Sequence, residues 1–380
     1  MTDLGILLRG QSNAAIFEAH GAAEKLRAEV ARDLGYDGVH DRVILFGDRQ
    51  RSLWPGVPFV LGGPARPDQT PWLTGFPGPG WGIGARERIF LDYLAGLPAP
   101  LRHAPVLTLW MHNETDTYGF GLTAQNWAQA VRYDATLVRR VLGVTPAASP
   151  YLFVWVPANF PPENGYKPRV MQTAQAIKQG MALLAEDPGF NGHLGPQTGD
   201  LDMSGGEAAG GAGPAGGLHF SAADSAALVH RMANCAADAV AAYAKPDAPA
   251  RGGALDCAGP VAVSAWQGGR VADVVHVRLA LPRGVVLAPL AAAAASGAGW
   301  RVLSAAQPDG VAPVSVTLGG ADDVALRFAR GLAAGATLYY GYGPGRIAKD
   351  GGPGQGAGLY GTDGIPMTTP PNGLPIRQVP

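Results

Sequence analysis

The sequence has few of the features that mark membrane, nucleic-acid-binding or metal-binding proteins. Its 380 residues include only two cysteines, Cys235 and Cys257, which we expect to be small buried residues rather than a disulfide or a metal site. No apolar run reaches the length of a transmembrane helix. The formal net charge of −1 gives no reason to expect nucleic acid or an anionic membrane as a partner. The first apolar run begins at Leu4 and leaves no room for a signal peptide, so the sequence predicts a cytoplasmic protein.

The N-terminal two thirds of the chain alternate between short apolar runs and segments with helical spacing. The runs are 4–8, 43–46, 106–110 and 151–156, and the helical segments are 14–34, 85–94, 126–142, 169–185 and 222–244. Strands that alternate with helices predict an α/β domain over residues 1–245, with a parallel sheet covered on both faces. The glycine-rich stretch 189–217 is expected to be a mobile loop, either a lid or an insertion.

A second pattern begins after residues 246–253, which have the composition of a linker. Residues 254–343 contain short alternating runs bounded by Gly, Pro and Asp, which predict a β-sandwich whose last strand is 338–343. The Gly/Pro-rich tail 344–380 has too few apolar residues for a core of its own. Three tyrosines near its start are expected to form a packed cluster or, less favoured, a platform for a sugar ring. They are Tyr339, Tyr340 and Tyr342.

Ten residues into the chain, an apolar run ends in Gly10-Gln11-Ser12-Asn13. A glycine that ends a strand just before a helix predicts a tight turn, with Ser12 exposed beside backbone N–H groups at the start of the helix. The alternative is a plain turn, because Gly, Ser and Asn all favour turns.

Two distant segments favour the functional interpretation. Residues 110–116, Trp-Met-His-Asn-Glu-Thr-Asp, follow a buried run, at the strand end where open α/β sheets bind ligands. His219 comes just before an alanine-rich helix, where Ser221 and Asp224 have the spacing of a helix cap. A serine on the first loop and a histidine on the last is an order that fits a nucleophile and its base.

These segments resemble the conserved blocks of SGNH-type hydrolases, in the branch of sialate O-acetylesterases and related carbohydrate acetylesterases. That family has GQSN in its first block, a third block similar to WHQGESD, and DxxH in its last. Residues 80–85, Gly-Trp-Gly-Ile-Gly-Ala, stand where it has a glycine block. The resemblance spans residues 4–245 and departs from the pattern at His112, Asn113 and Gly216, which replace Gln, Gly and the aspartate.

The resemblance implies a three-layer, flavodoxin-like SGNH domain and a serine esterase that removes acetyl from a carbohydrate hydroxyl. It makes Ser12 the nucleophile and His219 the base. Because Gly216 cannot orient His219, the acid is sought among Asp200, Asp202 and Glu207, with Asp202 preferred and a Ser–His dyad as the alternative. The implied oxyanion donors are Ser12 N–H, Gly82 or Gly84 N–H, and the side chain of Asn113 or His112. Supporting residues are Gln11, Glu114, Asp116, Asp200 and Glu207.

The expected partner is an acyl ester of a small molecule or a polysaccharide, without a cofactor or a metal. The aromatic residues Trp72, Phe76 and Trp81 are expected to face a sugar ring or to pack within loops. Two other function classes stay open. An acyltransferase would use the same acyl-enzyme, and a non-catalytic carbohydrate-binding or assembly protein would explain the missing aspartate. The sequence leaves the sugar and the oligomeric state open.

Overall fold

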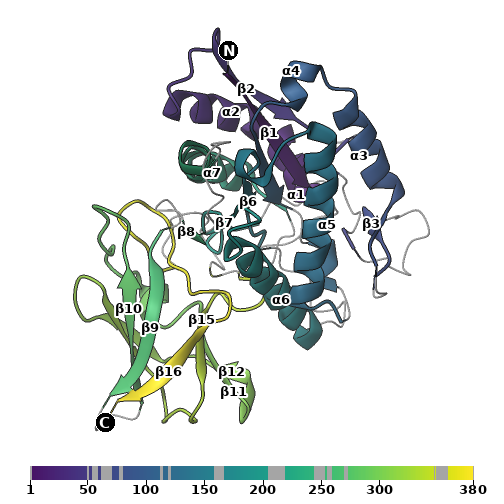
Figure 1. Cartoon of the computed structure of the whole chain (residues 1–380). Helices are drawn as coiled ribbons and strands as arrows, with labels where there is room; N and C mark the ends of the chain where they lie inside the picture. The colour runs from purple at the N-terminus through teal and green to yellow at the C-terminus, as the bar shows by residue number, and fades with distance from the viewer. Residues whose placement is uncertain are drawn as a thin grey trace. The chain divides into compact units, whose positions relative to one another are not determined.

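The computed structural model groups the chain into two compact units (Figure 1). It describes residues 2–48, 51–53, 59–60, 71–76, 80–111, 114–118, 121–157, 167–203, 219–243, 253–254, 259–268, 273–345, 347 and 358–379. Unit 1 comprises residues 1–156, 162–195 and 225–255, and unit 2 comprises 157–161, 196–224 and 256–380. This division differs from the predicted boundaries, because residues 196–224 group with the C-terminal strands.

Unit 1 is built on a six-stranded parallel sheet with the order β2-β1-β5-β6-β7-β8. The strands are β1 (Thr2–Gly10), β2 (Asp41–Phe46), β5 (Val106–Met111), β6 (Tyr151–Phe153), β7 (Gly192–Leu194) and β8 (Gly253–Ala254). Every residue of β5 is buried, as expected for an apolar strand with both faces covered. The predicted α/β class is therefore confirmed.

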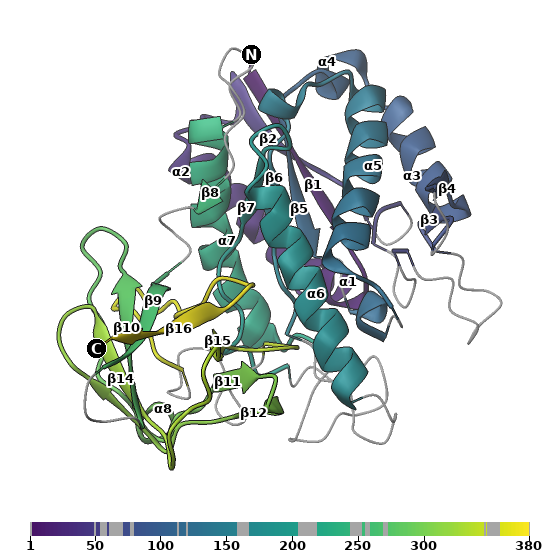
Figure 2. The same cartoon turned by 60° about the horizontal axis from the view of Figure 1, so that its bottom comes forward.

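Helices cover both faces of this sheet, with α3 and α5 on one side and α2 and α7 on the other (Figure 2). The helices are α1 (Ser12–Ala19), α2 (Ala22–Asp33), α3 (Ala85–Ala95), α4 (Ala99–Arg102), α5 (Ala124–Leu142), α6 (Lys167–Ala185) and α7 (Ala222–Tyr243). α5 packs against α3 and α6, and α1 packs against α2. The single helix predicted over 14–34 is wrong, because the chain breaks at Gly21, whose φ of 67° is left-handed.

Two short strands of the sheet were not predicted. β7 lies inside the stretch 189–217 that the sequence marks as a loop, and β8 takes in the last residue of the predicted linker. β7 has three residues and β8 has two, so neither is long enough to show an alternating pattern.

Unit 2 is an eight-stranded sheet with the order β12-β11-β15-β16-β9-β10-β14-β13. Its strands are β9 (Val261–Gly268), β10 (Val274–Ala280), β11 (Trp300–Ser304), β12 (Gln307–Val311), β13 (Ser315–Leu318), β14 (Asp323–Arg327), β15 (Thr337–Tyr340) and β16 (Leu374–Val379); a short helix, α8, covers Ala292–Ala295. One hydrophobic core includes side chains from both halves of the strand order. The predicted β-rich domain is confirmed, but it is one continuous sheet rather than two separate ones.

The last strand, β16, joins the two halves of this sheet. Its first residues pair antiparallel with β15, and Ile376–Val379 pair parallel with β9. The prediction of 338–343 as the last strand was therefore wrong. The tail, expected to have no core of its own, joins the core of unit 2. The tail contributes Leu359, Met367, Leu374 and Ile376 to the core.

The three tyrosines have different environments. Tyr340 is 6% exposed, packs with Trp300 at 4.8 Å between ring centroids, and accepts a hydrogen bond from the N–H of Leu359 at its hydroxyl. Tyr339 and Tyr342 are partly exposed, with ring centroids 5.0 Å apart. Tyr340 is therefore a core residue and not part of a sugar platform.

Cys235 lies in α7, is fully buried, and is disulfide-bonded. Its expected burial is confirmed, and the expectation that it forms no disulfide was wrong. The other cysteine of the chain, Cys257, lies outside the described residues.

Candidate functional site

Ser12 lies at the junction of β1 and α1, on the predicted strand-to-helix turn. Gly10 ends the strand, and a Cβ atom there would lie 2.2 Å from the Ala14 Cβ and 3.2 Å from the Met111 carbonyl oxygen. Only glycine permits the helix to begin so close to the sheet. Gln11 and Asn13 are buried, whereas Ser12 between them is partly exposed. Ser12 is therefore the most accessible residue of this turn.

The segment after β5 holds this turn from both sides. The Gln11 side chain accepts a hydrogen bond from the Thr115 N–H at 2.9 Å and donates one to the Thr115 hydroxyl. Glu114 Oε1 accepts from the Asn13 side-chain amide at 2.8 Å and from the Asn13 N–H at 3.3 Å. Partners that are 101 and 104 residues apart in sequence thus fix the residues on either side of Ser12.

Asp116 has a different partner. Its carboxylate is fully buried and accepts hydrogen bonds from the N–H groups of Phe59 at 2.8 Å and Val60 at 3.0 Å. The Phe59 ring packs edge-on against Trp110, with ring centroids 4.9 Å apart. Asp116 therefore holds a neighbouring segment against the aromatic core. His112 and Asn113, the predicted side-chain oxyanion donors, lie outside the described residues.

The glycine block forms the hairpin of β3 (Leu73–Thr74) and β4 (Gly82–Ile83). The Gly84 N–H donates to the Trp72 carbonyl oxygen at 2.7 Å. Because this N–H is used inside the fold, the prediction of Gly84 as an oxyanion donor is corrected. Gly82 pairs with Thr74 across the hairpin, two residues from the Gly84–Trp72 hydrogen bond, which is the position of the next hydrogen-bonded pair of the ladder. Its N–H is therefore also directed at a backbone carbonyl, and the hairpin offers neither predicted glycine N–H as a free donor.

The aromatic residues near the glycine block differ in exposure. Trp72 is fully buried in the core, so it does not face a sugar ring as the sequence suggested. Phe76 and Trp81 are partly exposed and stack on each other with ring centroids 6.2 Å apart. Only this stacked pair stays available for a ligand.

His219 and the candidate acids Asp200 and Asp202 belong to unit 2. His219 is 7% exposed, and burial lowers the pKa of its ring. Asp200 accepts a hydrogen bond from the Tyr360 hydroxyl at 3.2 Å. In the part of the chain that the structure describes, no carboxylate is hydrogen-bonded to His219; Glu207 and Gly216 lie outside that part.

Asp224 is the acidic residue that organises this region. Its carboxylate accepts the N–H groups of Asp202 and Met203, each at 3.0 Å, and of Ser221 at 2.9 Å. The Asp224 N–H in turn donates to the Ser221 hydroxyl at 3.0 Å, which completes the predicted helix cap. Burial, together with the nearby negative charge of Asp202, raises the pKa of Asp224 to about 6. Its cap spacing was visible in the sequence, but its contact with Asp202 was not.

The described ranges contain no group of three or more His, Cys, Asp or Glu side chains placed to hold a metal ion. They also contain no helix that is long and apolar enough to span a membrane.

Comparison with known proteins does not identify a family for this chain. No protein-family model and no curated protein matches the chain. Among solved structures, the S-layer protein rSbsC(31-844) matches with 13% identity and a TM-score of 0.17. The match covers 66% of this chain and 29% of that one. At this TM-score the likeness carries no argument on fold or function.

Proposed function

We propose that the protein is a serine esterase of the SGNH type that removes a small acyl group, most simply acetyl, from a carbohydrate hydroxyl. The observation that carries the proposal is the partly exposed Ser12 at the start of α1, between the anchored residues Gln11 and Asn13. The strand order β2-β1-β5-β6-β7 is also that of flavodoxin-like sheets, which bind ligands where the order reverses. That point lies between β1, which precedes Ser12, and β5, which precedes Glu114.

In the proposed reaction, the Ser12 hydroxyl attacks the ester carbonyl carbon while His219 takes its proton. His219 then passes that proton to the sugar oxygen as the acyl–oxygen bond breaks, and water releases the acyl group from Ser12 in the reverse sequence. Burial lowers the pKa of His219, so its ring is neutral and able to act as a base at pH 7.

The developing oxyanion needs fixed donors. The N–H of Ser12 belongs to the first turn of α1, where backbone N–H groups have no partner inside the helix. The side chain of Asn113, or of His112, completes the proposed set. Asp202 stays the preferred orienter of His219, with a backbone carbonyl as the alternative.

The disulfide at Cys235 favours an oxidising compartment over the cytoplasm that the sequence predicts. We therefore include an extracytoplasmic location in the proposal.

Turnover of p-nitrophenyl acetate by the full chain tests the proposal. Ser12→Ala is expected to lower kcat by a factor of about 10³ or more, and a fluorophosphonate probe should label Ser12 alone. Ser296→Ala, at an exposed serine of unit 2, is the matched control and should leave both results unchanged. Acetyl esters should react faster than octanoyl esters, because a small pocket excludes the extra methylenes.

The same assays separate the alternatives. Faster acetyl release with a sugar acceptor than in water alone would identify an acyltransferase. Absence of both turnover and labelling in the wild-type chain would overturn the enzyme and leave a binding or assembly protein. Faster reaction of octanoyl esters would replace the carbohydrate esterase with a lipid esterase.

A further inference from the structure

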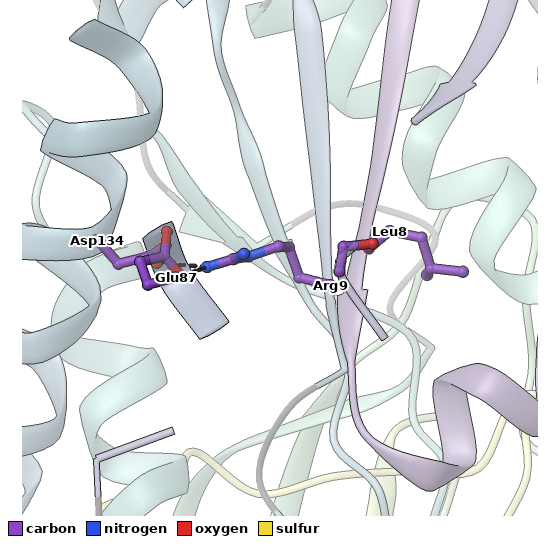
Figure 3. Close-up of polar contacts among 5 residues, drawn as sticks. Leu8, Arg9, Glu87 and Asp134 are labelled. Carbon is purple, nitrogen blue, oxygen red and sulfur yellow. Dashed lines mark hydrogen bonds and ion pairs between the residues drawn. The ribbon is translucent and has the colours of Figure 1, made fainter. Parts of the chain in front are cut away.

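Arg9 is a fully buried cation directly before the turn that carries Ser12. It is the next-to-last residue of β1, and its side chain extends to the side of the sheet covered by α3 and α5 (Figure 3). There the guanidinium donates to Glu87 Oε2 at 2.8 Å and to Asp134 Oδ1. Both carboxyl groups are themselves fully buried.

Aromatic rings enclose this guanidinium. Its central carbon lies 4.1 Å from the centroid of the Trp72 ring, 4.0 Å from that of Phe90 and 5.8 Å from that of Trp110. Removing charged groups from water is costly, and apolar side chains of similar volume often fill such a place without loss of stability. Stability alone therefore does not explain why a complete ionic cluster is buried at this position.

The cluster holds one cation and two carboxyl groups. Burial and the neighbouring charge of Glu87 raise the pKa of Asp134 well above its usual range. Two buried carboxyl groups thus have a single cation as their partner. Each member depends on the others, because loss of one leaves a buried charge without its counter-charge.

Two of the three members, Arg9 and Glu87, belong to segments next to the proposed site. Glu87 lies in the first turn of α3, three residues after Gly84 and five after Gly82. Trp72, which packs on the guanidinium, accepts the Gly84 N–H at its carbonyl oxygen. Arg9 is thus joined both to the strand that precedes the Ser12 turn and to the hairpin of the glycine block.

We infer that Arg9 is a positioning residue, which holds the Ser12 turn in place against the hairpin of the glycine block. This inference rests on the proposed function, in which Ser12 is the nucleophile. Arg9 does not touch the substrate. It acts through Glu87 and Trp72, and a displacement of the nucleophile by about 1 Å is enough to cost about 100-fold in rate.

A variant without any charge in the cluster tests the inference. Arg9→Met combined with Glu87→Leu and Asp134→Leu removes all three polar groups and leaves no unpaired charge. We expect it to melt within a few degrees of the wild type, with kcat for p-nitrophenyl acetate about 10- to 100-fold lower and KM changed less than about threefold. Hydrogen exchange should be faster in peptides that cover 10–15 and 80–88. Unchanged kcat and unchanged exchange would overturn the inference.

A second, milder variant keeps the inference testable if the triple variant does not fold. Arg9→Lys keeps the charge but replaces the planar guanidinium that lies against Trp72 and Phe90 by a compact ammonium, so kcat and exchange should change in the same direction by a smaller factor. Arg139→Met is the matched control, because Arg139 is also a buried cation on α5 but donates to the carbonyl oxygens of Ser149 and Phe190. It should lower the melting temperature and leave kcat unchanged.

The two proposals fail in different ways. If the wild-type chain shows no Ser12-dependent turnover, the esterase is wrong, and hydrogen exchange still reports whether Arg9 couples the two segments. If turnover is normal in the wild type and also in the uncharged variant, the esterase stands and the role of Arg9 is wrong.

Discussion

Glu114 and Asn13 are joined by two hydrogen bonds that end on a single carboxylate oxygen, one from the side-chain amide at 2.8 Å and one from the backbone N–H at 3.3 Å. This arrangement places a carboxylate at the N-terminus of α1, where the helix dipole favours negative charge. It also occupies the Asn13 N–H, so that the N–H of Ser12 is left as the donor nearest to the nucleophile.

Glu114→Ala should therefore disturb the turn as well as the fold. It leaves two buried donors of Asn13 without an acceptor, which costs about 1–3 kcal/mol for each group. We expect kcat to fall by a factor of about 10–100, with a lower melting temperature. Glu114→Gln keeps an acceptor oxygen and should retain most of the activity. Glu24→Ala, at an exposed residue of α2, is the control. A normal kcat in Glu114→Ala would show that the contact between Glu114 and Asn13 does not position Ser12.

The pH dependence of kcat/KM should follow His219. Burial disfavours its charged form and lowers its pKa below the 6.5 of an exposed imidazole. Activity should thus rise with pH through a midpoint below 6.5, because only the neutral ring takes the Ser12 proton. The profile of the full chain measures this midpoint, and His40→Gln, at an exposed histidine, should not move it. A midpoint above 7 would indicate a carboxylate that stabilises the imidazolium.

Asp202→Asn should stabilise the protein at neutral pH. Its partner Asp224 has a pKa of about 6 in the folded protein and an ordinary value of 3.8. The Asp224 carboxyl group therefore binds a proton more tightly in the folded protein than in the unfolded chain. The stability that this difference contributes is fully present below pH 3.8 and is lost as the pH rises through 6. An amide at 202 donates to the Asp224 carboxylate, so the melting temperature should rise at pH 7.5 and change little at pH 3.5. Asp309→Asn, at an exposed position, should change neither.

The same variant identifies the orienting acid. If Asp202 also orients His219, kcat should fall by about 10⁴-fold even though the protein melts higher. If kcat stays within a few-fold of the wild type, a backbone carbonyl is the better orienter and the site is a Ser–His dyad.

The long periodic elements were predictable from the sequence, because their pattern is local. β5 is a continuous apolar run, and α5 keeps its buried residues at helical spacing. β7 and β8 are too short for such a pattern. β16 was missed because Leu374 and Ile376 alternate over only a few residues and flank Pro375, which usually marks a loop.

The sequence named Ser12 and its turn, but it did not show what holds that turn. Arg9 closes an apolar run and looks like the exposed end of a strand. Its partners Glu87 and Asp134 lie 78 and 125 residues further along the chain, so no local pattern marks the cluster. The error at Gly84 has a similar cause, since only the fold shows that its N–H is already donated to Trp72.

Reduction of the disulfide at Cys235 should destabilise the protein. Cys235 is fully buried in α7, and the described residues contain no free cysteine. A disulfide stabilises a chain by restricting its unfolded state, typically by about 2–4 kcal/mol. We expect the melting temperature to fall on addition of a reductant, and the denatured but unreduced protein to show no thiol that reacts with a thiol reagent.

Alanine variants of the two cysteines show which cysteine is the disulfide partner of Cys235. If Cys235 is bonded to Cys257 of the same chain, then Cys235→Ala, Cys257→Ala and the double variant should melt at nearly the same temperature, and a reductant should not lower it further. This follows because each change removes the same single bond, so the effects cannot add. If the bond joins two copies of the chain instead, the wild type should migrate as a dimer without reductant. A melting temperature that is independent of reductant in the wild type would contradict the disulfide and restore the cytoplasmic prediction.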